Sequence, residues 1–414
     1  MITLVSPCAV GAEPVLANEL SLLGFTPIER ATGRVVYTAG DAKASSGESA
    51  DLRGSAELAA AYRANLRLRT ADRVYLRVIS CPCVDFDSLF EAVRAFSWKD
   101  WFKKDVRVVV DKVRTHKSRL SSERAVQGVV HKAIYESLGA AWRMQTLPET
   151  GETATVRVYL EKDVLSVMLD LSGMPLHRRG YRTAGGEAPI RETLAAVLLQ
   201  LCLWRRKTPL HDPFCGSGTI PIEATLFAHN IAPGLGRTFA LEGLSPYLGE
   251  AGRRLVEAER AAAAADIRTD CLVRVTGSDI DPAILVSARG NAERACTIAE
   301  KALSLVGRSE SIARPDFIEA PFDTLAAPYP EGLILANPPY GERLGDADSA
   351  GELYRSMAAL RTAFPGWDMG FITSHEGFEA SFGSFATRKK DLKSGNLETR
   401  FYLYGKGVAN GNSR

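Results

Sequence analysis

The chain has 414 residues, which is too long for one ordinary hydrophobic core and therefore predicts two or three domains. Its hydrophobic fraction of 46% and charged fraction of 24% are those of ordinary globular proteins, so the composition excludes a largely disordered chain. The formal net charge of +2 says little by itself, but the charges are unevenly distributed along the sequence.

Basic and acidic residues are concentrated in different segments. Residues 61–120 hold 14 Lys and Arg against 7 Asp and Glu, residues 181–385 hold 19 against 26, and the tail from residue 386 holds 7 against 2. A basic segment beside an acidic one predicts a region that binds a polyanion, attached to a body with a different role. Charges can also segregate in this way by chance on solvated surfaces, so the pattern alone leaves both interpretations open.

Cysteine usage and hydropathy indicate the cytoplasm. The seven cysteines contain no CxxC pair, which is typical of reduced thiols, and the six scattered histidines indicate no metal site. The longest apolar stretch, LAAVLLQLCLW, is too short to span a bilayer, and the N-terminal residues lack the features of a signal peptide. We therefore expect a cytoplasmic protein with no bound metal and no membrane partner.

The first 170 residues combine strands and helices in small units. Residues 1–58 alternate strand-like runs with one helical pattern, PVLANELSLLG, and the polar, small-residue stretch 40–56 predicts a loop. From residue 59 the pattern predicts a helix, a strand, a helix, a strand, a basic loop, a helix capped by Ser121 or Ser122, and a closing hairpin. Residues 1–58 and 59–170 are thus expected to form two mixed α+β domains.

The pattern changes after about residue 170. Helical and short apolar strand-like segments alternate as far as a final hairpin, whose turn is predicted near residues 395–396. This alternation predicts a doubly wound, mostly parallel α/β sheet over residues 171–407, followed by a flexible tail over 408–414. Ligands of such sheets bind at the carboxyl ends of the strands, so residues at those ends are candidates for a site.

Three strand ends carry residues suited to a nucleoside that is attached to an amino acid. HDPFCGSGTIPIEA combines an acid with a tight Gly-x-Gly turn before a helix, where backbone N–H groups can hold a carboxylate. No GK[ST] follows, and Pro221 stands at the third glycine position of a dinucleotide motif, which argues against a Walker loop and a nicotinamide dehydrogenase. In GSDIDP, Asp279 can take both hydroxyls of a ribose, and in RPDFIEAPFDTL, Asp316 and Phe317 can bind an exocyclic amine and cover a purine.

A fourth strand end reads ANPPYGERLG and follows the apolar run EGLILAN. Proline lacks the N–H that strand pairing needs, so two consecutive prolines end the strand abruptly. The break leaves an asparagine amide before the prolines and a tyrosine ring after them.

The order DPFCGSGT, SDID, DF and NPPY resembles that of class I S-adenosylmethionine (SAM)-dependent methyltransferases that modify exocyclic amines. NPPYGERLG, with RGYR and EAPIRETLAA before the glycine loop, resembles one subgroup, the THUMP-domain RNA guanine-N2 methyltransferases, including those that act on 23S rRNA. The resemblance implies a Rossmann-like class I methyltransferase domain with a mostly parallel seven-stranded sheet over 171–407. It also implies a preceding α+β region, made of a ferredoxin-like subdomain over 1–58 and a THUMP-like RNA-binding domain over 59–170.

The same resemblance implies SAM as the cofactor. The loop from Asp212 to Thr219 would hold the methionine part, Asp279 the ribose, and Asp316 with Phe317 the adenine. The residues implied for cofactor binding are Asp212, Pro213, Cys215, Gly216, Gly218, Thr219, Asp279, Ile280, Asp316, Phe317 and Glu187, the last of which would close the pocket.

The resemblance also implies a direct transfer with no covalent intermediate. In similar enzymes the asparagine side-chain oxygen and the next proline carbonyl accept both hydrogens of the target amine, whose lone pair is otherwise delocalised into the base. Carried over, Asn337 and Pro338 position the amine and aim its lone pair at the sulfonium methyl, and Tyr340 stacks on the base.

The basic segment VRTHKSRLSSER fits an RNA partner, because side chains of this kind grip phosphates. The candidates for RNA binding are Arg114, His116, Lys117, Arg119 and Arg124. The alternative is an exposed basic loop without a partner.

Four alternatives to methylation of guanine N2 in 23S rRNA stay open at this point. The RNA can be tRNA, since THUMP domains occur in both kinds of enzyme, and an NPPY turn also suits adenine N6. The chain can be an RNA-binding assembly factor that no longer catalyses transfer, although Asn337, Asp279 and the glycine loop argue against this. Cys215 at a helix N-terminus can be a nucleophile of the kind that pyrimidine C5 methyltransferases use, but it lies inside the cofactor loop.

Overall fold

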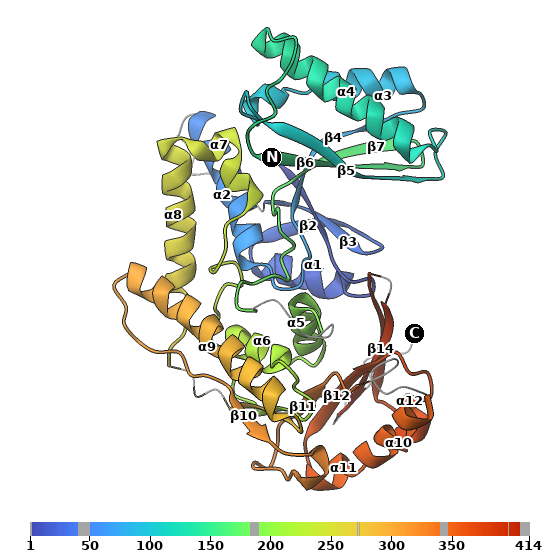
Figure 1. The fold of residues 1–414 in the computed structure, drawn as a ribbon, viewed down its shortest axis with the longest axis vertical. Helices are drawn as coiled ribbons and strands as arrows, with labels where there is room; N and C mark the ends of the chain where they lie inside the picture. Colours follow the sequence, from blue (N-terminus) through green and yellow to red (C-terminus); the bar gives the residue numbers. More distant parts are fainter. Residues whose placement is uncertain are drawn as a thin grey trace.

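The structure is a computed structural model that describes residues 2–39, 50–182, 190–270, 272, 274–339, 347–395 and 397–405, without the side chains of 50–55 and 347–349. These residues form an elongated molecule built on two seven-stranded sheets, one above the other in Figure 1. No helix among them is long and apolar enough to cross a membrane. Nor does this part of the chain contain a group of three or more acidic, histidine or cysteine side chains that could hold a metal ion.

The first sheet has the strand order β2-β3-β1-β4-β7-β6-β5, and only β5 and β6 run parallel. Its strands are β1 (Thr3–Pro7), β2 (Phe25–Ala31), β3 (Arg34–Ala39), β4 (Tyr75–Pro82), β5 (Arg107–His116), β6 (Thr153–Glu161) and β7 (Val164–Asp170). Its helices are α1 (Glu13–Leu22), α2 (Ala50–Arg67), α3 (Phe86–Arg94), the short η1 (Trp98–Asp100) and α4 (Glu123–Trp142). The helices α3 and α4 cover one face of the part formed by β4, β7, β6 and β5 (Figure 1).

Of two local predictions in this region, one is confirmed and one is wrong in part. Ser122 caps α4 as expected, since its side chain accepts a hydrogen bond from Ala125 N at 3.3 Å. The stretch 40–56 is not entirely a loop, because α2 begins at Ala50. This helix also crosses the boundary that was placed between residues 58 and 59.

The second sheet has the strand order β10-β9-β8-β11-β12-β14-β13. Its strands are β8 (Leu210–Asp212), β9 (Val275–Asp279), β10 (Asp316–Glu319), β11 (Leu333–Ala336), β12 (Asp368–Thr373), β13 (Arg388–Ser394) and β14 (Leu397–Tyr404). The first five strands in this order are parallel, and β14 runs antiparallel to both of its neighbours. The predicted mostly parallel seven-stranded sheet is confirmed, and the predicted C-terminal hairpin supplies its last two strands.

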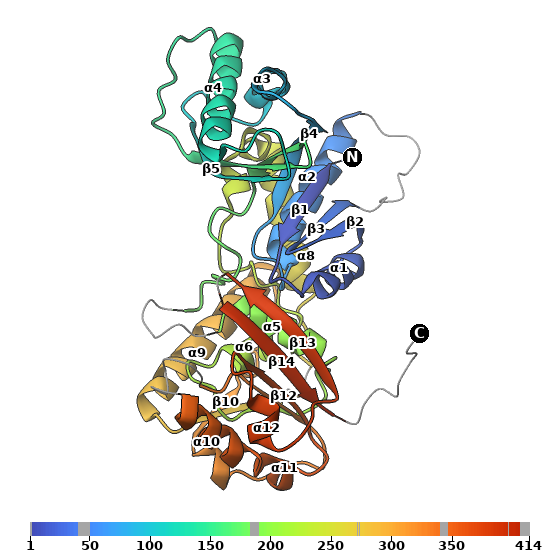
Figure 2. The same cartoon turned by 90° about the vertical axis from the view of Figure 1, so that its right-hand side faces the viewer.

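Helices cover both faces of the second sheet. The helices in this part of the chain are α5 (Glu192–Leu201), α6 (Thr219–Ala228), α7 (Ser245–Leu248), α8 (Glu250–Ala265), α9 (Pro282–Leu305), α10 (Ala347–Met357), α11 (Leu360–Ala363) and α12 (Phe378–Phe382), with η2 (Ala240–Gly243) and η3 (Phe322–Thr324). Of these, α7 and α8 lie in the upper part of the molecule near α2 and do not cover the second sheet (Figure 1). In β11, Leu335 belongs to the hydrophobic cluster that contains α5, whereas Ile334 and Ala336 belong to the cluster of α10 and α12. In Figures 1 and 2, α5 and α6 accordingly lie above the sheet and α10, α11 and α12 below it.

The two sheets are joined by packed helices and by one short bridge. α2 lies beside α8 (Figure 1), and Arg63 on α2 makes two hydrogen bonds to the Glu259 carboxylate on α8, one of them 3.0 Å from Nε to Oε2. Val10 forms an isolated antiparallel bridge with Lys393 at the end of β13. These contacts fix the upper part of the molecule against the lower one.

Candidate active site

The glycine loop follows β8 directly and is tied to the neighbouring strand. Asp212, the last residue of β8, is buried, and its Oδ1 accepts a hydrogen bond from Phe214 N at 3.1 Å. Cys215 N donates to Ser278 O of β9 at 3.0 Å, and Gly218 N donates to Cys215 O at 2.8 Å. The loop, in which Pro213 is also buried, is therefore held against the carboxyl end of β9.

Two glycines determine the shape of this loop. Gly216 and Gly218 have φ angles of +50° and +83°, in the left-handed region that other residues adopt with strain. A Cβ atom on Gly218 would also lie 2.8 Å from a ring carbon of Phe317. The turn leads into α6, which begins at Thr219, so the loop ends at a helix N-terminus, a position that suits an anionic group.

Asp279 connects the glycine loop to the end of β9. Its Oδ2 accepts a hydrogen bond from Gly216 N at 3.0 Å, and its Oδ1 accepts one from Asp281 N at 3.1 Å. The next side chain, Ile280, is 71% exposed. A carboxylate that backbone donors orient in this way, beside an exposed apolar side chain, suits a ribose and the base attached to it.

The structure corrects the assignment of the adenine to Asp316 and Phe317. Asp316 begins β10 opposite Thr276, whereas Glu319 lies opposite Asp279, so Asp316 is at the other end of the strand. Phe317 is only 8% exposed and packs beneath the glycine loop. The residues of β10 that lie at the same edge as Asp279 and the glycine loop are Glu319 and the next residue, Ala320. Ala320 N donates a hydrogen bond to Asp279 O at 3.1 Å.

The turn after β11 lies at the same edge as the glycine loop. Ile334 pairs with His211 in the parallel register of β11 and β8, which places Asn337 just beyond the level of Asp212. All four residues of β11 are buried, Asn337 is half-buried and Pro338 is buried. Within the described part of the chain, no residue donates a hydrogen bond to the Asn337 side chain or to the Pro338 carbonyl.

Tyr354 on α10 supports this turn, and sequence reasoning missed it. Its side chain is fully buried, and its hydroxyl donates to Pro339 O at 3.2 Å and lies 2.9 Å from Thr373 Oγ1 at the end of β12. Nothing in the sequence distinguishes this tyrosine from an ordinary helix core residue. Two predicted site residues, Tyr340 and Glu187, lie outside the described residues.

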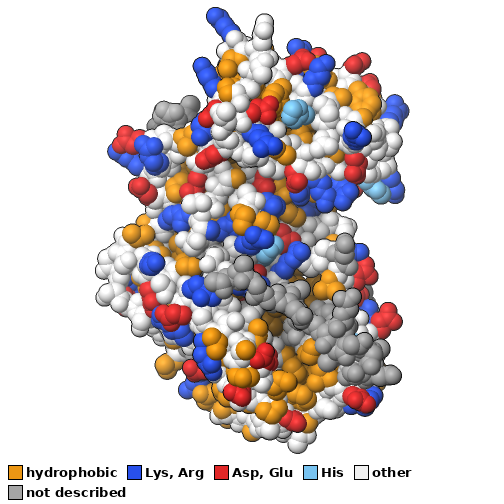
Figure 3. Space-filling view, viewed as in Figure 1, with side chains coloured by type: hydrophobic (Ala, Val, Ile, Leu, Met, Phe, Trp, Pro, Cys, Tyr) orange, Lys and Arg blue, Asp and Glu red, His pale blue; other side chains and the backbone are white. Residues whose placement is uncertain are grey.

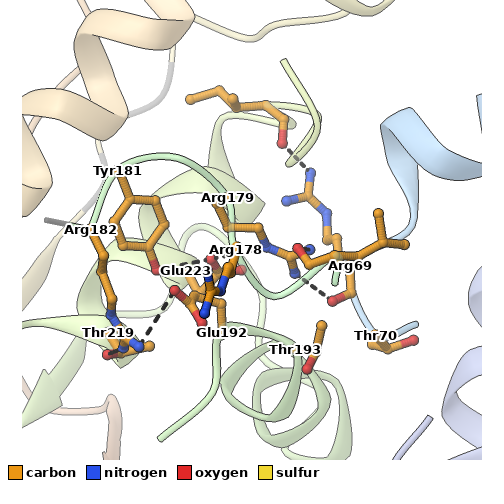
Figure 4. Close-up of polar contacts among 12 residues, drawn as sticks. Arg69, Thr70, Arg178, Arg179, Tyr181, Arg182, Glu192, Thr193, Thr219 and Glu223 are labelled. Carbon is orange, nitrogen blue, oxygen red and sulfur yellow. Dashed lines mark hydrogen bonds and ion pairs between the residues drawn. The ribbon is translucent and has the colours of Figure 1, made fainter. Parts of the chain in front are cut away.

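A buried polar network lies behind the glycine loop (Figure 4). Arg182 Nη2 donates to the hydroxyl of Thr219, the first residue of α6, and Arg182 Nη1 lies 3.4 Å from Glu192 Oε1. Burial raises the pKa of Glu192, whose Oε2 has no hydrogen-bond partner in the described structure. The hydroxyl of Ser217 in the loop is likewise buried without a partner. The motifs RGYR and EAPIRETLAA contain Arg182 and Glu192.

Burial also determines the protonation of the residues around the loop. It raises the pKa of Asp212 well above its ordinary value, and the charge of Asp279 raises it further. Burial raises the pKa of the Cys215 thiol, so this cysteine remains protonated and is a poor nucleophile, against the alternative considered above. His211 is held neutral because burial lowers its pKa to about 4.

The candidate RNA-binding residues gather at one end of the first sheet, on β5, the following loop and the start of α4. Arg114 Nη1 lies 3.5 Å from Glu123 Oε1, and Arg119 Nε lies 3.8 Å from Asp163 Oδ2. His116, Lys117 and Arg124 are exposed. The carboxylates of Glu123 and Asp163 reduce the net positive charge at this end of the sheet.

Comparisons with known proteins match almost the whole chain. Residues 179–402 match the family described as "RMKL-like, methyltransferase domain", residues 83–170 match the THUMP domain, and residues 3–46 match the ferredoxin-like domain of RlmL. The putative RNA methyltransferase YpsC of Bacillus subtilis (strain 168) is 35% identical over 408 residues, which are 97% of this chain and 95% of that protein.

Two further comparisons agree. The ribosomal RNA large subunit methyltransferase K/L of Shewanella baltica (strain OS195) is 29% identical over 401 residues, which are 95% of this chain but 52% of that protein, so the chain spans about half its length. The crystal structure of SMU.472, a putative methyltransferase complexed with SAH, superimposes with a TM-score of 0.81 at 32% identity, covering 98% of this chain and 99% of that one.

Proposed function

The chain belongs to the RMKL-like methyltransferase-domain family, and from this membership we propose that it methylates the exocyclic N2 amine of a guanine in 23S rRNA. Family membership and the THUMP domain make the protein a SAM-dependent RNA methyltransferase. The base, the atom and the choice of RNA are the proposed part. The name of the K/L relatives, which are ribosomal RNA large subunit methyltransferases, supports the choice of RNA, and the NPPY motif supports an exocyclic amine.

One structural observation carries the proposal: β11 ends in Asn337 and Pro338 at the edge where β8 ends in the glycine loop. The amine of guanine is a weak nucleophile because its lone pair is delocalised into the ring. The Asn337 side-chain oxygen and the Pro338 carbonyl are two acceptors that can bind both amine hydrogens and orient the lone pair. Tyr354 holds the next carbonyl, that of Pro339, so it stiffens the turn without using either acceptor.

The residues around the glycine loop fit SAM. The N-terminus of α6, where the glycine loop ends, suits the carboxylate of its methionine part, and Asp279 suits the ribose hydroxyls. The unpartnered oxygens of Glu192 and Ser217 are buried acceptors near the start of α6. SAM supplies a methyl group on a positively charged sulfur, and the chain's own residues bind it, exclude water and hold the amine.

We expect Asp279→Asn to weaken SAM binding by about 10- to 100-fold, the range for loss of hydrogen bonds to a charged group. Asp316→Asn is the matched control, because Asp316 lies at the far end of β10 and should leave the affinity within about twofold. Isothermal titration of SAM into each variant measures both values. An equal loss of SAM affinity in the two variants would show that Asp316 belongs to the cofactor site. It would contradict the inference from the register of β10 and β9 that Asp316 lies away from the site.

The proposed reaction is tested by incubating the protein with methyl-labelled SAM and unmodified 23S rRNA or tRNA, followed by mass analysis of the nucleosides. The proposal expects N2-methylguanosine in 23S rRNA. The same product in tRNA alone would overturn the choice of RNA, and N6-methyladenosine would overturn the base. Absence of label in either RNA, with SAM still bound, would favour a non-catalytic assembly factor.

A further inference from the structure

The first sheet has a face that its helices leave uncovered. In β6, Ala154, Val156, Val158 and Leu160 are buried under the helices, and the residues between them point to the opposite side. Figure 2 shows β1 and β3 in front of α2 and α8, and Figure 1 shows α3 and α4 on only one side of the strands. We call the other side, formed by β3, β1, β4, β7, β6 and β5, the open face.

Strand register concentrates positive charge on the open face. Lys112 of β5 lies opposite Arg157 of β6, Arg157 opposite Met168 of β7, and Met168 opposite Arg77 of β4, so three basic residues share one row across four strands. Of the three, Arg157 is paired with Asp111, 2.9 Å from Nη2 to Oδ2. Arg114 lies opposite Tyr159 in the adjacent row on the same face. Lysine, arginine and histidine side chains are visible at the right-hand edge of the upper body in Figure 3.

Two arginine–tyrosine stacks lie on the open face. The guanidinium of Arg34 lies 5.2 Å from the centre of the Tyr159 ring, and Arg34 is held there by a 2.7 Å hydrogen bond to Glu161. The guanidinium of Arg157 lies 5.0 Å from the centre of the Tyr75 ring, but Tyr75 is 1% exposed, so only the first stack is accessible to a base. Aromatic rings and guanidinium planes are the surfaces on which unpaired bases of RNA stack.

The Arg34–Tyr159 stack borders a cavity of about 290 Å³. Its floor is apolar and consists of Val5, Val36 and Met168, which are 3%, 4% and 1% exposed. Its rim includes the cations Arg34, Arg77 and Lys162 and the acids Glu29 and Glu161. Glu161 is already paired with Arg34, and Arg77 forms no ion pair with any described residue.

We propose that the open face holds an unpaired nucleotide of the RNA substrate, with its base over the Arg34–Tyr159 stack and its phosphate at Arg77. The apolar floor matches a base, and the unpaired cation of Arg77 matches a phosphate. A duplex does not fit this cavity, because its bases are stacked on each other and their faces are not exposed. The inference rests on the proposed function only in that the substrate is RNA.

Two of the candidate RNA-binding residues lie on β5 itself and face the proposed nucleotide. His116 lies opposite Glu161 and Arg114 opposite Tyr159, so both belong to the open face by register. Lys117, Arg119 and Arg124 lie beyond the end of β5. The nucleotide subsite therefore continues from the open face toward the loop.

A labelled single-stranded oligouridylate of about twelve nucleotides tests the proposal by fluorescence anisotropy, with a duplex RNA of equal length as comparison. We expect Tyr159→Ala to weaken single-strand binding by about 5- to 150-fold, the range for loss of one stacked base. Tyr159→Phe keeps the ring and should bind within about twofold of the wild type. Arg77→Ala should weaken binding and lower the slope of log Kd against log salt by about one.

Lys132→Ala is the matched control for Arg77→Ala, because Lys132 is an exposed cation on α4, on the covered side of the sheet. Equal binding by the wild type, Tyr159→Ala and Arg77→Ala would overturn the proposal, as would an equal loss in Lys132→Ala. Binding of the duplex in preference to the single strand would also overturn it. The probe contains no guanine, so failure of this binding test is distinct from failure of N2 methylation.

Discussion

Replacement of Asn337 by alanine is expected to lower the rate constant of methyl transfer at saturating SAM and RNA by about 10²- to 10³-fold, the usual cost of removing one oriented hydrogen-bonding group from an active site. The variant keeps the Pro338 carbonyl but loses the second acceptor, so the amine lone pair is no longer oriented. Single-turnover transfer of labelled methyl groups to the RNA substrate measures the effect.

Two controls distinguish an effect on the methyl-transfer step from an effect on the fold or on SAM binding. SAM affinity should stay within about twofold in Asn337→Ala, because no described residue depends on a hydrogen bond from Asn337. Asn337→Asp retains an oxygen acceptor at the same position and should transfer faster than Asn337→Ala. Full activity of Asn337→Ala would contradict the assignment, and a parallel loss of SAM binding would assign Asn337 a structural role.

Loss of the buried cation at position 179 is expected to destabilise the fold by about 3–5 kcal/mol, the cost of leaving the opposite buried charge unpaired. The side chains of Arg179 and Glu223 are 2% and 1% exposed, and Arg179 Nε lies 3.5 Å from Glu223 Oε1. Arg179 also donates to Leu176 O at 2.7 Å and to Arg69 O at 2.5 Å (Figure 4). Urea unfolding of Arg179→Ala and the wild type compares the two free energies.

The partner residues provide the controls for this second prediction. Tyr181→Phe removes only the 3.1 Å hydrogen bond from the hydroxyl to Glu223 and should cost about 1 kcal/mol. The double variant Arg179→Met/Glu223→Met removes both charges and should recover much of the stability lost in Arg179→Ala. A double variant as unstable as Arg179→Ala would show that lost packing, and not the unpaired charge, causes the effect.

Local sequence determined most of the region that contains the second sheet. The apolar run before Asn337 is a buried strand because it is hydrophobic on both faces, and the two prolines end it because neither can donate to a neighbouring strand. Gly216 and Gly218 stand where the backbone has positive φ, which is why HDPFCGSGT indicates a tight turn before a helix. These features depend on residues that are adjacent in the chain, so they can be predicted from a single sequence.

The region that contains the first sheet was predicted less completely. Its alternating strands were recognised, but residues 50–56 were expected to lie in a loop, and the structure places them in α2. This helix packs against α8, which lies almost 200 positions later in the chain, and such a contact outweighs the weak helix preference of a polar, glycine-containing segment.

Strand register and long-range packing were decided only by the tertiary structure. The sequence DFIE predicts a strand whatever its register. Whether Asp316 or Glu319 lies at the edge of the glycine loop depends on how this strand pairs with β9. Tyr354 reaches the Pro339 carbonyl, and Arg179 reaches Glu223, only because separate helices and loops pack together. The sequence by itself therefore determined the mostly parallel α/β sheet, the glycine loop and the end of β11 before Asn337. The tertiary structure decided which side chains stand beside them, since register is set by partners distant in the chain.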